Sequence, residues 1–170
     1  MIKLIATDQL NAHFDMLSCY VGSAMSLHAN VMDGIADNLK NSNGKLTNEI
    51  LIEQIITAFY LSRHALELAI KALIKITTGN DEQGHNLEKL WEKIPKQNDV
   101  LKEIVKKPFD ILKKYDLLEN EELFRYHINK RGIALKNLII ERNDFDLLVD
   151  AIWSIRQIIL ECAHLQKDFV

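Results

Sequence analysis

Three charged residues on one predicted helix are the first feature of this 170-residue chain that could do chemistry. Arg63, Glu67 and Lys71 stand four residues apart, so they form a ladder along one face of the helix. One interpretation is a pair of intrahelical ion pairs, each contributing about 0.2–0.5 kcal/mol. The other is a polar seam on a largely buried helix, where charges are costly unless they are paired or used. Ile70 and Ile74 flank the same side and favour the second interpretation.

Residues further along the chain could join this ladder. His85 precedes a short predicted helix, where it would either serve as a turn residue or a cap for exposed backbone groups, or face the seam and help to form a pocket. Arg125 and Tyr126 could supply an anion clamp and a stacking surface for a base. Alternatively, Tyr126 packing and an Arg125–Glu67 ion pair would pin a loop to the rest of the protein.

Other kinds of site find little support in the sequence. His13 and His28 are fifteen residues apart with no neighbouring ligands, so we expect no metal and no cofactor. The sequence has no Gly-rich phosphate loop, nucleophile elbow or paired catalytic carboxylates. The remaining candidates are expected in the core, Cys19 and Cys162 as reduced thiols and Trp91 and Trp153 as packing residues.

The composition is that of a globular protein, with 48% hydrophobic and 26% charged residues. The net charge of −3 argues against a generally basic nucleic-acid binder. Residues 124–142, however, carry five Lys or Arg against one Glu, so an anionic partner should meet this segment first. Neither a signal peptide nor a membrane-spanning apolar run is evident, so we expect a cytoplasmic protein with no membrane partner.

Apolar residues repeat at steps of three and four along most of the chain, which predicts amphipathic helices. We expect helices at Leu10–Leu39, from a Thr47 or Asn48 cap to Thr78–Gly79, from His85–Leu87 to Pro95, from an Asn98 or Asp99 cap to Tyr115–Leu118 with Pro108 kinking it or opening a new turn, and onward from an Asn143 or Asp144 cap. The second helix is apolar on most sides and should be central. The sequence therefore predicts a single all-α domain over residues 1–170, an antiparallel bundle of about five helices with one irregular or hairpin-like basic loop near residues 121–143.

Three segments together resemble one protein family. Residues 60–73, YLSRHALELAIKAL, resemble the core helix of HEPN-type proteins (higher eukaryotes and prokaryotes nucleotide-binding). Residues 84–87, GHNL, resemble the Gly-His-Asp-Leu helix start of one subgroup, and FRYH at 124–127 followed by KRG at 130–132 resembles its Phe-Arg-Tyr-Pro loop and Gly turn. The order and rough spacing agree over about residues 50–165. Asn86 replaces the usual Asp, and His127 replaces the usual Pro, which leaves the loop conformation open.

The resemblance implies a helical bundle, frequent homodimers, and binding or cleavage of RNA or nucleotides, in a toxin–antitoxin, defence or mobile-element setting. Ribonucleases of the family carry an Arg, four to six intervening residues and then a His on one helix, for phosphate stabilisation and acid–base chemistry. No arginine of this chain is followed by a histidine at that spacing, and Arg156 and His164 have seven residues between them. The standard nuclease pair is therefore absent.

The leading hypothesis is a HEPN-like RNA- or nucleotide-binding module, expected as a homodimer, without standard ribonuclease catalysis. Its candidate ligand-binding residues are Arg63, His64, Glu67, Lys71, His85, Arg125, Tyr126 and His127. One alternative is a non-catalytic dimerisation or protein-interaction domain whose long first and last helices bind a partner. Another is a ribonuclease with an atypical site that uses His127 or His64.

Overall fold

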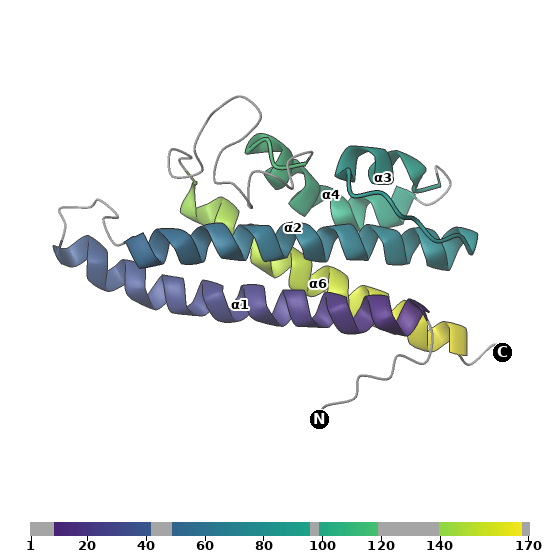
Figure 1. Ribbon diagram of the computed structural model, residues 1–170, viewed down its shortest axis with the longest axis horizontal. Coiled ribbons are helices and arrows are strands. Elements are labelled where there is room, and N and C mark those ends of the chain that lie inside the picture. Colours follow the sequence, from purple (N-terminus) through teal and green to yellow (C-terminus); the bar gives the residue numbers. More distant parts are fainter. Residues whose placement is uncertain (1–8, 42–48, 96–98, 119–139, 168–170) are drawn as a thin grey trace.

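The computed structural model of the chain describes residues 9–41, 49–95, 99–118 and 140–167, and the side chains of residues 14–35, 49–95, 102–118 and 140–161 within them. Five helices make up most of these residues, α1 (Gln9–Asn41), α2 (Glu49–Thr78), α3 (Leu87–Lys93), α4 (Asp99–Lys114) and α6 (Arg142–Lys167). Figure 1 shows α1 and α2 side by side in opposite directions, with α6 beside both and with α3 and α4 on the side of α2 away from α1. The described residues contain no strand, so the predicted all-α bundle is confirmed. The predicted basic loop at 121–143 lies almost entirely outside the described residues.

The first helix follows the predicted repeat. Its buried residues recur every three, four or seven positions and face α2 and α6: Phe14, Leu17, Val21, Ala24 and Val31. His28 belongs to the same predicted stripe, but it is only half-buried and hydrogen-bonds to Asp146 of α6 through Nε2, at 2.7 Å. A single apolar stripe therefore packs α1 onto two neighbours.

The central position predicted for α2 is confirmed. From Ala58 to Ile74 nearly every side chain is buried, because α1, α3, α4 and α6 all pack against this helix. The predicted end is also confirmed. Gly79 follows the last helical residue with a φ of 75°, a left-handed conformation that glycine adopts without strain, and its N–H donates to the carbonyl of Lys75 at 2.9 Å. The predicted Thr47 or Asn48 cap lies outside the described residues.

The helix α3 is capped by Asn86, not by His85. The Asn86 side-chain oxygen accepts a hydrogen bond from the N–H of Lys89 at 3.0 Å, which satisfies one of the donors left at a helix start. Of the two roles open to His85, the cap is therefore wrong. Downstream, Pro108 lies inside one continuous α4, so of the two predicted roles it does not open a new helix.

A polar clamp joins the end of α4 to the start of α6. Tyr115 donates its hydroxyl to Asp144 at 2.8 Å and accepts the N–H of Glu141 at 3.0 Å, while Lys114 Nζ pairs with Asp144 at 2.7 Å. Hydrogen bonds from Lys114 and Tyr115 hold the pKa of Asp144 below its usual value. Because Asp144 is committed to this clamp, the predicted Asn143 or Asp144 cap is wrong. The helix begins at Arg142, and the carbonyl of Glu141 accepts its first backbone bond.

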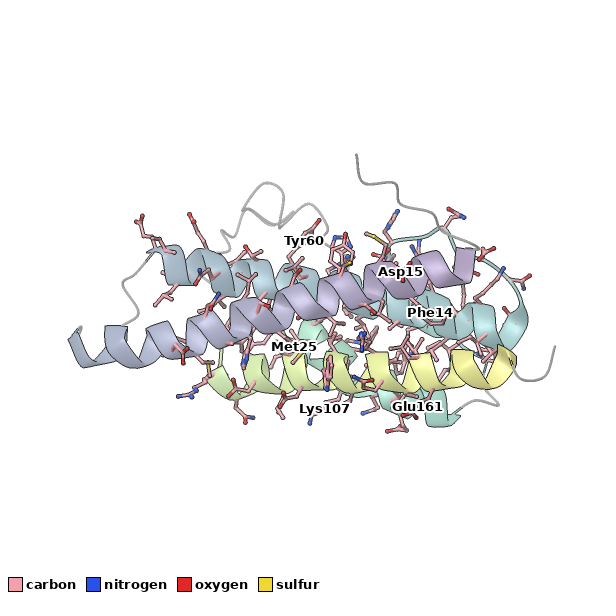
Figure 2. The ribbon with its side chains drawn as sticks, turned by 90° about the horizontal axis from the view of Figure 1, so that it is seen from below. Phe14, Asp15, Met25, Tyr60, Lys107 and Glu161 are labelled. Carbon is pink, nitrogen blue, oxygen red and sulfur yellow. The ribbon has the colours of Figure 1, made fainter. Side chains whose placement is uncertain are left out.

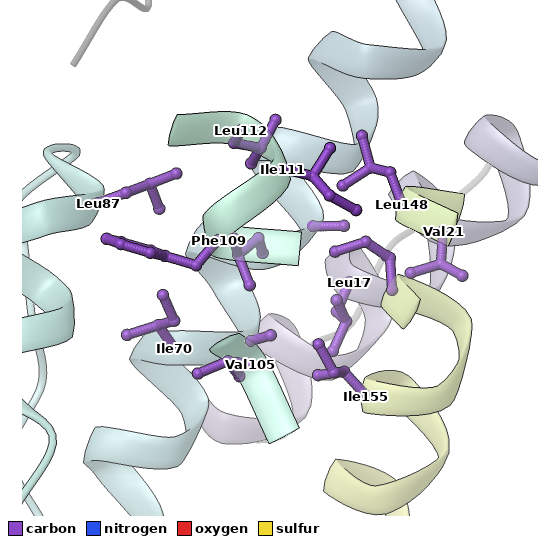
Figure 3. Packing of buried hydrophobic residues seen from close by; sticks show 14 of the residues in the cluster. Leu17, Val21, Ile70, Leu87, Val105, Phe109, Ile111, Leu112, Leu148 and Ile155 are labelled. Atoms are coloured by element: carbon purple, nitrogen blue, oxygen red, sulfur yellow. The ribbon is translucent and has the colours of Figure 1, made fainter. Parts of the chain in front are cut away.

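The apolar core draws on every described helix (Figure 3). Phe59 of α2 lies parallel to Phe145 of α6, with ring centroids 5.5 Å apart, and meets Tyr115 edge-on at 5.7 Å. Such pairs stabilise a core beyond the burial of their area. Among the described helices, none is long and apolar enough to cross a lipid bilayer.

Two residues predicted in the core are exposed. Trp153 is 40% exposed and Cys19 is exposed, so neither packs in the interior. Trp91 is half-buried and stacks on Phe109, as a packing residue should. The side chain of Cys162 lies outside the described residues. Cys19 lies two residues from both Leu17 and Val21, on the face of α1 opposite the apolar stripe. Trp153 follows the buried Ile152 at the edge of the α6 stripe, where periodicity does not say which side a neighbour covers.

Candidate functional site

Arg63 lies at the centre of the polar seam on α2 and is only 1% exposed. Its Nε donates to the carbonyl of Leu117 at 3.0 Å, and its Nη2 donates to the carbonyls of His85 at 2.9 Å and Leu118 at 3.3 Å. Its Nη1 donates to Glu67 Oε2 at 3.4 Å. The guanidinium thus ties the middle of α2 to the segment before α3 and to the segment after α4. Its donors are turned into the protein.

The carboxylate of Glu67 joins the other members of the seam. Its Oε1 accepts hydrogen bonds from Lys71 Nζ at 2.8 Å and from His85 Nδ1 at 2.9 Å, and its Oε2 faces Arg63. Burial by itself raises the pKa of Glu67. The hydrogen bond and charge of Lys71, the hydrogen bond of His85 and the charge of Arg63 outweigh burial, so the pKa lies below its ordinary value of 4.5. Glu67 is therefore ionised at neutral pH.

The seam carries more positive than negative charge. Arg63 and Lys71 are both buried, at 1% and 7% exposure, and Glu67 is the carboxylate that lies between them. Among the residues that the structure describes, Arg63, Lys71 and Glu67 sum to one positive charge in a region with little solvent to screen it. An ion-pair ladder on a helix surface would be worth little, whereas this buried arrangement is costly unless its polar groups are paired. The interpretation as a buried polar seam therefore describes the structure better than an exposed ladder.

The segment between α2 and α3 is tied down at three points, and this fixes His85. Lys75 of α2 pairs with Asp81 at 2.8 Å, and Lys93 of α3 pairs with Glu82. Both acidic side chains of this segment are therefore directed to cations outside the seam. The third tie is His85 itself, which contacts the seam through its backbone carbonyl and its Nδ1. Its side chain is nevertheless 62% exposed, so the seam ends in an oriented imidazole at the surface.

His64 has a different environment. Its ring lies nearly parallel to that of Tyr20 of α1, with centroids 5.3 Å apart, and meets the ring of Tyr60 edge-on at 4.4 Å. The side chain is 15% exposed, and its Nδ1 lies 4.0 Å from Glu67 Oε2. The carboxylate of Glu67 therefore has one imidazole on each side, a largely covered His64 and an exposed His85.

The structure brings together five of the eight predicted site residues, namely Arg63, His64, Glu67, Lys71 and His85. The other three, Arg125, Tyr126 and His127, lie outside the described residues, as does the predicted Arg125–Glu67 ion pair. The segment that contains them follows Leu118 in the chain. Leu118, the last described residue before them, lies beside the seam because Arg63 binds its carbonyl.

Two parts of the site were missed by sequence reasoning. The carbonyls of Leu117 and Leu118, which hold Arg63, belong to apolar residues whose backbone role leaves no mark on the sequence. Tyr20 comes from α1, about forty residues before His64, and nothing in the spacing of the two residues links them. Its position on the border of the α1 apolar stripe, three residues after Leu17, was the available signal.

A second histidine–carboxylate pair joins α1 to α6. His28 and Asp146 form it at 2.7 Å, and Arg142 Nε lies 3.8 Å from the second oxygen of Asp146. This group is small, half-exposed and separate from the seam. In the part of the chain that the structure describes, no set of three or more His, Cys, Asp and Glu side chains is placed to hold a metal ion.

Comparisons with family models, curated proteins and solved structures found no match to this chain. The resemblance to HEPN-type proteins therefore rests on the three sequence segments alone. The function must be argued from the seam and its surroundings.

Proposed function

We propose that this protein is a HEPN-like module that binds RNA or nucleotides through their phosphates, without standard ribonuclease catalysis. One observation carries the proposal: the described charged side chains of the buried seam sum to one positive charge, and the seam ends in the exposed, oriented imidazole of His85. Because Nδ1 donates to Glu67, a hydrogen bond from this ring to a ligand requires the imidazolium form, in which Nε2–H is the second donor. A phosphate is the biological anion that such a positively charged donor suits best. We also propose that the protein is cytoplasmic, as the sequence predicts, and a homodimer, as the resemblance implies.

The contacts divide between the seam and the basic segment. Arg63 holds backbone carbonyls and Glu67, so it contributes charge and rigidity and makes no direct ligand contact. Glu67 and Lys71 orient the His85 ring and set the local charge. Direct contacts come from His85 and from the sequence-predicted Arg125 and Tyr126, which follow Leu118.

Binding of a labelled short single-stranded RNA at low salt, measured by fluorescence anisotropy, tests the proposal. We expect binding that weakens steeply as salt is added, because phosphate contacts release counterions. His85→Ala should weaken it about tenfold or more, the loss expected for a hydrogen bond to a charged group. The matched control is Lys106→Ala, which removes an exposed cation paired with Asp110 on α4 and should change the affinity little. Arg125→Ala should also weaken binding and reduce its salt dependence.

Each rival has a different outcome in the same experiment. Turnover of the RNA that disappears in His64→Ala or His127→Ala would support the atypical ribonuclease. An absence of RNA and nucleotide binding, with a tight homodimer in sedimentation, would support the protein-interaction domain. Equal affinity in the wild type and His85→Ala would remove the seam from the binding site.

A further inference from the structure

A small aromatic cluster lies beside the seam on the α1–α2 side. The ring of Tyr20 covers one face of His64, at 5.3 Å and an interplanar angle of 21°, and Tyr60 meets the same imidazole at 88°. Tyr60 and His64 are one helical turn apart on α2, while Tyr20 comes from α1. Figure 2 shows Tyr60 on the side of α2 that faces away from α6. The cluster therefore belongs to a surface separate from the core rings.

The two tyrosines of the cluster are less buried than the aromatic cluster of the core. Phe59, Phe145 and Tyr115 are all buried, at 1%, 2% and 7% exposure. Tyr20 and Tyr60, in contrast, are only half-buried. Met16, one turn before Tyr20 on α1, is 48% exposed. Ring and thioether surface is thus left at the protein surface.

The cluster and the seam share one carboxylate. Glu67 faces His64 through Oε2, at 4.0 Å, and His85 through Oε1, at 2.9 Å. The ring cluster and the proposed phosphate contact therefore both adjoin one carboxylate. A ligand with a flat aromatic part and a phosphate is the class that matches a stacking surface next to a cationic one.

We propose that Tyr20, Tyr60 and His64 form a stacking platform for one base of the RNA or nucleotide whose phosphate meets His85, in which the base lies against the face of one tyrosine ring and the edge of the other. This inference rests on the proposed function, and it adds that the site binds a base as well as a phosphate. Every base has a π-face, so the platform binds without strong sequence preference. Tyrosine suits the role because its large ring has few rotatable bonds to immobilise. His64 acts here as a ring that positions Tyr20 and Tyr60.

The test compares two probes with equal phosphate content, a short single-stranded RNA and an abasic oligomer of the same length. If a base stacks on the platform, the RNA should bind the wild type about 5- to 150-fold more tightly than the abasic oligomer, the range expected for one stacked base. Tyr20→Leu and Tyr60→Leu should bring the RNA affinity down towards that of the abasic oligomer and leave abasic binding unchanged. Tyr20→Phe keeps the ring and should retain the wild-type affinity.

A matched control removes an exposed aromatic ring elsewhere. Trp153→Leu acts on α6, away from the seam, and should leave both affinities unchanged. Equal binding of both probes, or Tyr→Leu variants that match the wild type, would overturn the platform while the phosphate site stands. If neither probe binds the wild type, the proposed function falls and the platform falls with it. Circular dichroism of each variant shows that a loss of affinity is not a loss of fold.

Discussion

Replacing Arg63 with methionine tests whether the seam is a structural tie. The side chain is 1% exposed, and methionine keeps its length and most of its volume, so the change removes polar contacts more than packing. Three carbonyls lose a donor, those of Leu117, His85 and Leu118. The Leu118 carbonyl still accepts a longer hydrogen bond from the N–H of Leu87, at 3.5 Å. The carbonyls of Leu117 and His85 are therefore the two most affected by the loss of Arg63.

The expected cost follows from these contacts. A buried polar group left without its partner costs about 1–3 kcal/mol, so two carbonyls give about 2–6 kcal/mol before any relaxation. The Glu67 carboxylate also loses one of its cations but keeps Lys71 and His85. Because such effects are not additive, we expect Arg63→Met to destabilise the fold by about 3–5 kcal/mol, most of it from the backbone carbonyls left without a donor.

Urea unfolding followed by far-ultraviolet circular dichroism measures this free energy of unfolding. Equal slopes of the free energy against urea concentration show that the variants expose the same amount of surface on unfolding. Lys71→Met is the matched control, since it removes a seam cation that hydrogen-bonds to Glu67 and, among the described residues, holds no backbone carbonyl. It should cost about 1–3 kcal/mol, in the range of one charge-assisted hydrogen bond. An Arg63→Met cost below about 1 kcal/mol, or one equal to that of Lys71→Met, would refute the tie.

Three further predictions concern the fold and its pH dependence. A Cβ at Gly34 would lie 2.5 Å from Leu51 Cδ2, so Gly34→Ala should destabilise the protein by about 1–3 kcal/mol. A Cβ at Gly22 meets open space, so Gly22→Ala should stabilise the protein by about 0.5–1 kcal/mol. Thermal unfolding of the two variants and the wild type compares these effects. The folded-state pKa of Glu67 lies below 4.5, so its stabilisation is present above that value and is lost as the pH falls through the folded pKa. Unfolding free energies from about pH 5 to about pH 3 should therefore fall more steeply in the wild type than in Glu67→Gln, and parallel slopes would contradict this. Tyr115→Phe removes both hydroxyl bonds to the start of α6 and should cost about 1–2 kcal/mol in urea unfolding, and an unchanged stability would show that the clamp contributes nothing.

Much of the fold was predictable because helical periodicity is a local property. The apolar repeat of α1, the largely buried α2 and its stop at Gly79 all follow from residue types at fixed spacings. Helix starts were predicted less well. Asn143 or Asp144 was a reasonable cap by type, but Asp144 is held by Lys114 and Tyr115, thirty residues earlier in the chain.

The candidate site was predictable in its members more than in their roles. The Arg63–Glu67–Lys71 ladder and its contact with His85 were anticipated from residue spacing and from the GHNL segment. Spacing could not tell whether Arg63 would meet a ligand or backbone carbonyls. The partner of Arg63 depends on how the segment after α4 packs against α2.

The sequence by itself determined an all-α protein with its charged ladder on the most apolar helix, because side chains three and four apart share a helix face in any surroundings. Tertiary structure alone decided that the ladder is buried and that Asn86 rather than His85 caps α3. It also placed Tyr20 against His64. These outcomes depend on contacts between residues far apart in the chain, whose geometry is fixed only when the helices pack and the buried polar groups find partners.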